Sequence, residues 1–300
     1  MISAWTFGTL PEGRVVTAYQ LTSESGFRAV VLDYGVTLQA LYLPDGRNVT
    51  LGHDSLDAYL DGAGYRGAII GPNANRIVGA SFEIDGQHVE VSTNDGENNL
   101  HSGDTGFHTQ IWNARIEEDV LIFSHTAQAG TGGFPGHLSV TLRISFRNDT
   151  LRLEMRAETN APTPVNLTWH PYWNLNGRGR IDGHDLSVSA DNRSILETAQ
   201  TVPVKETRFD FRKALPLGHV RLDDNFKDVK EARLKGHSTE LKVTSSLPDM
   251  QVYTGDALSV PRSGVALEPQ FQPNDINLDQ RSLLRPGEIY DHWIAYRFDI

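Results

Sequence analysis

Period-two alternation of apolar and polar residues is the feature that most constrains this chain. Val140, Leu142, Ile144 and Phe146 alternate with polar residues, and the same spacing resumes at Leu151 after Asn148-Asp149. Successive side chains of a strand point to opposite faces, so this spacing predicts a half-buried antiparallel hairpin with its turn at Asn148-Asp149.

A second hairpin is predicted around Asp85-Gly86, because both central residues of a type I′ turn need positive φ and this dipeptide tolerates it. Further alternating runs lie at 15–22, 27–43, 120–127, 186–190, 240–244 and 293–300. Helical periodicity is nearly absent, apart from one short turn expected at 56–60. Many short strands separated by turn residues predict a large antiparallel all-β fold, a sandwich or a barrel, and the period alone does not distinguish them.

The chain has 300 residues, which is enough for two average domains or for one large all-β domain. Gly and Pro are scattered singly at turns, and no linker or low-complexity run divides the pattern. We therefore expect a single domain over residues 1–300.

The formal net charge is -11, so the average surface repels phosphate backbones and anionic lipids. Nucleic acid and membranes are therefore not expected partners. The basic run from Lys227 to Lys235 is interrupted by acidic residues and is interpreted as a solvated face. The chain has no cysteine, and its first residues lack a basic segment followed by an apolar one, so the expected location is the cytoplasm.

The segment Trp169-His170-Pro171-Tyr172-Trp173 places one histidine between aromatic side chains. Aromatic faces pack against the apolar faces of a pyranose ring, and an imidazole can give or take a proton near neutral pH. By itself, this segment fits a structural histidine as well as a sugar site.

Four more segments occur in a characteristic order: Asn73-Ala74-Asn75-Arg76-Ile77, Asn98-Asn99-Leu100-His101-Ser102-Gly103, Gln251-Val252-Tyr253-Thr254-Gly255 and Gly264-Val265-Ala266-Leu267-Glu268-Pro269-Gln270. Together with the His170 segment, they resemble the aldose 1-epimerase (galactose mutarotase) family from about Val15 to the end. The resemblance implies a large antiparallel β-sandwich of the galactose mutarotase type, whose concave sheet carries the site.

The resemblance also implies the reaction, which is acid/base opening and reclosure of a free sugar ring to exchange its α and β anomers. Glu268 matches the family's base, His170 its general acid, and His101 a second histidine near the ring oxygen, with roles that could be partly exchanged. A neighbouring carboxylate is expected to raise the pKa of His170. A surface Glu268 paired with Arg281 or Arg285 is the structural alternative.

Sugar contacts are implied for Asn75, Arg76, Asp223 and Gln251, with Asp224 as an alternative to Asp223. Trp169 and Trp173 replace residues that commonly flank the family's histidine, so Trp173 is expected to contact the sugar and to influence which sugar is preferred. The sequence does not identify that sugar.

This mechanism needs no metal or other cofactor, and the histidines lack the spacings typical of zinc sites. Two other interpretations remain open. A hexose-phosphate 1-epimerase would need basic residues for the phosphate, for which Arg178 and Arg180 are the candidates. A non-catalytic sugar-binding protein could use the same groove.

Overall fold

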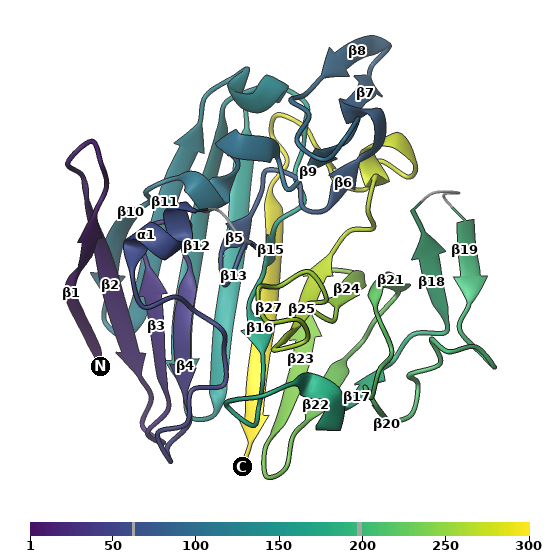
Figure 1. Ribbon diagram of the computed structural model, residues 1–300. Coiled ribbons are helices and arrows are strands. Elements are labelled where there is room, and N and C mark those ends of the chain that lie inside the picture. Colours follow the sequence, from purple (N-terminus) through teal and green to yellow (C-terminus); the bar gives the residue numbers. More distant parts are fainter. Residues whose placement is uncertain (62–63, 197–199) are drawn as a thin grey trace.

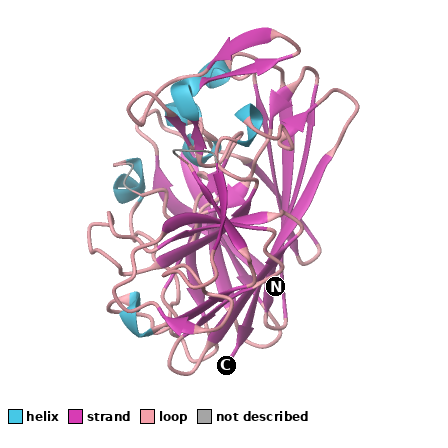
Figure 2. Ribbon diagram, turned by 90° about the vertical axis from the view of Figure 1, so that its right-hand side faces the viewer, coloured by secondary structure: helices cyan, strands magenta, loops and turns pink. Residues whose placement is uncertain are grey.

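The computed structural model describes residues 1–61, 64–196 and 200–300. These residues form mostly antiparallel strands, with one short α-helix, α1 (Leu56–Leu60), and brief 3-10 turns at the periphery (Figures 1 and 2). None of the described helices is long and apolar enough to cross a membrane.

The largest sheet has nine strands and forms the broad back of the molecule in Figure 1. Its strands, in spatial order, are β10 (Asn113–Glu117), β11 (Val120–Ala127), β12 (Leu138–Arg147), β13 (Thr150–Thr159), β27 (Tyr290–Asp299), β23 (Glu240–Ser245), β22 (Ala232–Lys235), β17 (Asp185–Val188) and β20 (Leu215–Pro216).

Two smaller sheets complete the main architecture. One has four strands: β1 (Ile2–Thr9), β2 (Val15–Thr22), β3 (Arg28–Leu32) and β4 (Leu38–Tyr42). The other has six, in the order β16 (Tyr172–Trp173), β25 (Val265–Gln270), β24 (Asp249–Tyr253), β21 (Asp223–Lys227), β18 (Asn192–Ile195) and β19 (Gln200–Pro203).

Four short strand pairs connect the loops: β5 (Ile69–Ile70) with β15 (Thr168–Trp169), β6 (Arg76–Ile77) with β9 (Asn99–Leu100), β7 (Ser81–Ile84) with β8 (Gln87–Glu90), and β14 (Thr163–Pro164) with β26 (Leu283–Leu284).

One apolar cluster joins all three large sheets. It includes Val31 of the four-stranded sheet, Leu142 and Ile294 of the nine-stranded sheet, and Val252 and Leu267 of the six-stranded sheet. Burial of apolar area is the main favourable contribution to folding, so this shared core holds the sheets face to face. The prediction of a large antiparallel β-sandwich is confirmed.

Both predicted hairpins are present. Leu142 lies opposite Met155 in the β12–β13 pair, and Ser81–Ile84 pairs with Gln87–Glu90. Asp85 and Gly86 have φ of 53° and 75°, as a type I′ turn requires. The run at 27–43 is two strands, because the chain turns between Leu32 and Leu38.

Candidate active site

A row of polar side chains crosses the six-stranded sheet on the face opposite its core. Glu268 of β25 lies opposite Gln251 of β24, Gln251 opposite Asn225 of β21, and Asn225 opposite Ser194 of β18. Their sequence neighbours Leu267, Val252 and Phe226 belong to the apolar core. Because side chains alternate along a strand, the same register that buries the apolar residues aligns the polar ones in a row.

Two members of this row, Glu268 and Gln251, line a cavity of about 310 Å³. The sheet supplies Tyr172, Asp223, Gln251, Tyr253 and Glu268, and the segments outside it supply Tyr65, Asn75, Arg76, His101, His170 and Leu258. The lining of the cavity combines polar groups with aromatic and aliphatic ones. Such a combination suits a pyranose, which has polar edges and apolar faces.

A wider hollow of about 490 Å³ adjoins this cavity and shares Asn75, Arg76, Asp223 and Gln251 with it. Asp224 lines only the hollow, where its Oδ1 accepts a hydrogen bond of 2.7 Å from Arg193 Nη1. Of the two neighbouring aspartates, the structure therefore brings Asp223 rather than Asp224 into the cavity.

Glu268 and His170 face each other at the base of the cavity. Glu268 Oε1 lies 3.5 Å from His170 Nε2, and both side chains are at least 95 % buried. Burial raises the pKa of Glu268 well above its usual range, and the charge of Asp223 adds to the effect. Burial also lowers the pKa of His170 to about 4. The expectation that a carboxylate would raise the pKa of His170 is therefore wrong, because burial removes the water that would stabilise the charged ring.

His101 is held by a reciprocal pair of hydrogen bonds with Asn75. The Asn75 backbone N–H donates to His101 Nδ1 at 3.1 Å, and the His101 backbone N–H donates to the Asn75 carbonyl at 3.0 Å. Both residues have positive φ, 58° and 54°, a conformation that costs energy outside glycine and recurs at functional sites. Because Nδ1 accepts a hydrogen bond, the neutral ring carries its hydrogen on Nε2 and is a donor there. Burial, followed by the charge of His170, lowers the pKa of His101 well below its usual range.

Nitrogen and carboxylate atoms of His101, His170 and Glu268 lie within 4.8 Å of one another, as metal ligands do. The sequence spacing did not indicate this cluster, because its members come from three distant segments. Coordination through His101 Nε2 would require a hydrogen on Nδ1, which would then oppose the Asn75 N–H. The backbone contact thus favours a hydrogen-bond donor over a metal ligand.

Two of the remaining polar groups of the cavity, Gln251 and Arg76, are held by carboxylates. Gln251 Nε2 donates to Asp223 Oδ1 at 2.7 Å, and Arg76 Nε donates to Asp95 Oδ2 at 2.7 Å. Gln251 Oε1, Glu268 Oε2 and His170 Nδ1 are buried without a hydrogen-bond partner among the described residues. An unpaired buried polar atom is costly, so these three, all on residues that line one cavity, favour a site for a polar ligand.

A sequence model of the family described as Aldose 1-epimerase matches residues 17–297 of this chain. The chain belongs to the aldose 1-epimerase family. It is 35% identical to galactose mutarotase from Bos taurus, over 98% of this chain and 97% of the relative. It is 31% identical to aldose 1-epimerase from Escherichia coli, over 96% of each chain.

Solved structures share the fold of this chain. An aldose epimerase homologue from C. elegans superposes with a TM-score of 0.88 at 27% identity, covering 93% of this chain and 98% of the other. A galactose 1-epimerase from Lactobacillus acidophilus gives a TM-score of 0.91 at 22% identity, covering 100% and 98%.

Trp173 does not line the cavity of this epimerase family member, and the expectation that it contacts the sugar is corrected. Its ring is completely buried in the core, with its centroid 5.0 Å from that of Tyr296 and 5.7 Å from that of Phe298. Trp169 is equally buried, and its Nε1 donates to the Val36 carbonyl at 3.0 Å. The intervening His170 faces the cavity because alternate residues point to opposite sides of the chain.

Trp173→Phe should therefore change stability and leave sugar preference unchanged. The smaller ring leaves a void, but it also removes a buried Nε1–H that has no partner among the described residues, so we expect a loss of about 1–2 kcal/mol in the free energy of unfolding. Denaturant unfolding and the ratio of kcat/KM for a hexose and a pentose would measure the two effects. A changed ratio of kcat/KM at unchanged stability would instead support contact between Trp173 and the sugar.

Tyr65 was missed by the sequence analysis. Its ring centroid lies 4.6 Å from that of His101 and 6.2 Å from that of His170, so it forms a wall of the cavity. It lies in a turn with a φ of 52°, outside every motif considered. Its Gly-rich surroundings, Gly64-Tyr65-Arg66-Gly67, are typical of a turn but do not reveal its proximity to the histidines.

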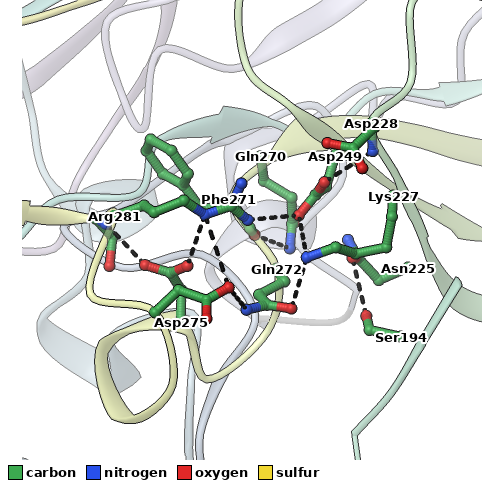
Figure 3. A network of polar contacts seen from close by, with 12 residues as sticks. Ser194, Asn225, Lys227, Asp228, Asp249, Gln270, Phe271, Gln272, Asp275 and Arg281 are labelled. Atoms are coloured by element: carbon green, nitrogen blue, oxygen red, sulfur yellow. Dashed lines mark hydrogen bonds and ion pairs between the residues drawn. The ribbon is translucent and has the colours of Figure 1, made fainter. Parts of the chain in front are cut away.

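The basic run that begins at Lys227 is only partly solvated. Lys227 is buried, and Figure 3 shows its amino group between Gln272 and Asp249, with Nζ 2.8 Å from Gln272 Oε1 and 3.4 Å from Asp249 Oδ2. Arg281 Nη2 also reaches Asp249 Oδ2, at 3.1 Å. The network beside the polar row thus occupies Arg281, while Arg285 pairs with Asp85. Neither arginine forms an ion pair with Glu268 among the described residues, so the structural alternative for Glu268 is not supported.

Proposed function

We propose that this protein is an aldose 1-epimerase that interconverts the α and β anomers of a free aldose. The observation that carries the proposal is the buried Glu268–His170 pair, whose reactive atoms lie 3.5 Å apart at the base of a polar and aromatic cavity. Full-length similarity to galactose mutarotases and aldose 1-epimerases supports it.

In the proposed reaction, the Glu268 carboxylate takes the proton of the anomeric hydroxyl and the His170 imidazolium protonates the ring oxygen. The bond between C1 and the ring oxygen then breaks and leaves an open-chain aldehyde. Rotation about the C1–C2 bond presents the other face of the carbonyl, and the two groups reverse their roles to close the ring.

The raised pKa of Glu268 and the lowered pKa of His170 favour a proton on the carboxyl group rather than on the ring in the free protein. The catalytic arrangement holds the same number of protons, with the proton moved to Nε2, which lies 3.5 Å from Glu268 Oε1. Sugar hydroxyls that donate to the carboxylate would stabilise its ionised form, because hydrogen bonds to a charged group favour that charge. Substrate binding can therefore move the proton without exchange with solvent.

His101 would donate from Nε2 to the ring oxygen or a neighbouring hydroxyl, since its Nδ1 is already occupied. The sugar hydroxyls on carbons other than C1 would bind Asn75, Arg76, Asp223 and Gln251. Arg76 is itself held by Asp95, and Gln251 by Asp223, so both donors are oriented before the sugar arrives.

The value of kcat/KM should be constant over a range of pH and fall at both lower and higher pH. Below a pH of about 4, His170 gains a proton while Glu268 keeps its own, so the pair contains no base. As pH rises through the raised pKa of Glu268, the pair loses its only proton and contains no acid. We expect kcat/KM to fall on both sides, and a pH profile corrected for spontaneous mutarotation would measure it. An acid limb near pH 6.5, the usual pKa of histidine, would contradict the assignment.

Polarimetry of freshly dissolved α-anomers of glucose, galactose, arabinose, xylose and fucose tests the proposal and identifies the preferred sugar. An accelerated approach to the equilibrium rotation is expected, and the rate should be the same after dialysis against EDTA. Binding without acceleration would instead support a non-catalytic sugar-binding protein. Arg178 and Arg180 do not line the cavity, and Arg180 pairs with Asp182 at 2.6 Å, so neither favours a sugar phosphate as substrate.

A further inference from the structure

A second cavity, of about 250 Å³, lies beside the sugar cavity and shares only Tyr65 with it among their lining residues. The Tyr65 ring contacts His101 on the sugar side and His108 on the other, with centroid separations of 4.6 and 4.9 Å. The proposed catalytic residues do not line this second cavity. Its volume suits a molecule the size of a monosaccharide.

Arg66 is the cation of this cavity, and it has no carboxylate partner among the described residues. Its Nη2 donates to Ser259 Oγ at 2.9 Å, and its Nε is buried without an acceptor in the described part of the chain. A partly buried guanidinium that keeps an unpaired N–H is suited to a ligand carboxylate, because its fixed fork matches the two carboxylate oxygens.

The other polar groups around Arg66 are those that bind hydroxyls. His53 Nε2 and His108 Nδ1 are buried without partners among the described residues. The Tyr59 hydroxyl accepts a hydrogen bond of 2.9 Å from the His53 backbone N–H and keeps its own hydrogen available. Asp104 is the one acidic residue in the lining and can accept hydrogen bonds from ligand hydroxyls.

We propose that this cavity is a second ligand site that binds a small polyhydroxylated carboxylate, that is, a sugar acid. The carboxylate pairs with Arg66, and the hydroxyls bind Asp104 and the two histidines. The Tyr34 and Tyr59 rings supply the apolar contacts. This site goes beyond the proposed function, and its occupancy does not depend on catalysis.

Isothermal titration calorimetry with sodium gluconate tests the site, with glucitol as the matched ligand in which a CH₂OH group replaces the carboxylate. Gluconate is expected to bind one site per chain in the presence of a saturating aldose, and glucitol at least about tenfold more weakly, as expected for loss of a charge-assisted contact. Equal binding of the two ligands, no binding of gluconate, or its displacement by the aldose would overturn the proposal.

Two variants locate the binding. Arg66→Gln removes the cation, and we expect gluconate affinity to fall about tenfold or more, whereas Arg178→Gln, at an arginine outside both cavities, should leave it unchanged. Ala58→Leu retains Arg66 but adds a larger side chain from α1 to the cavity, and it should weaken gluconate binding by a similar factor. Unfolding temperatures identify variants that have lost the fold. Unchanged affinity in a folded Arg66→Gln protein would refute the site.

Discussion

Glu268→Gln is expected to lower kcat by about 10²–10⁴-fold, because the amide keeps the shape of the side chain but cannot take the anomeric proton. Its environment is otherwise retained, since Gln251 and Leu267 hold the strand in register. Polarimetric progress curves at saturating sugar would measure kcat, and Glu154→Gln, an exposed carboxylate on β13, is the matched control.

The same substitution should not destabilise the fold. Because the pKa of Glu268 is raised, the folded protein keeps a proton that the unfolded chain releases above its ordinary pKa, and this difference costs stability increasingly as pH rises. Glutamine carries no such cost. We therefore expect an unfolding temperature at pH 7 to 8 that is equal to or above that of the wild type. A well-folded variant that retained more than about a tenth of kcat would exclude Glu268 as the base.

His170→Asn should also lower kcat by about 10²–10⁴-fold while changing sugar affinity much less, because the loss falls on proton transfer rather than on ground-state contacts. Calorimetric titration with a free sugar, alongside kcat, separates the two quantities. His88→Asn is the matched control, because His88 lies 3.6 Å from Glu90 in an exposed pair that resembles the buried one in distance only.

A rise in KM with kcat unchanged would make His170 a binding residue, and the acid would have to be sought at His101. The structure bears on whether His101 could be the acid. Its Nδ1 accepts a hydrogen bond from the Asn75 N–H, so the hydrogen of the neutral ring is on Nε2. A histidine locked in this way can donate a hydrogen bond but returns a proton poorly, so His101→Asn is expected to affect the rate less than His170→Asn.

Much of the fold follows from alternation and turn chemistry. The strands Val15–Thr22 and Val120–Ala127 coincide with the predicted runs, because both combine a regular period of two with clear turn residues at their ends. The two-residue strands, such as Tyr172–Trp173 and Thr168–Trp169, carry too few residues to show a period. The sequence pattern therefore could not predict these strands, although they position His170.

The motifs identified the proposed site residues, but they did not predict how deeply these residues are buried or which side chains surround them. Sequence alone gave the wrong direction for the pKa of His170, because the pKa depends on burial by neighbours that are distant in the chain. It also assigned Trp173 to the cavity on adjacency to His170, whereas the backbone turns the two side chains to opposite sides. Lys227 shows the same limit, since its partner Gln272 belongs to a loop far along the chain.

The register of β25 sets how much change in chain length this strand can tolerate. Within it, Leu267 points into the core and its neighbour Glu268 points to the opposite face. Inserting or deleting one residue before Leu267 would exchange the faces to which the later side chains of the strand point. Leucine would then be exposed in the sugar cavity and the carboxylate would be buried among apolar side chains. A one-residue change of length here should therefore remove activity and folding together, whereas loops such as the one carrying Tyr65 can vary in length without inverting a strand.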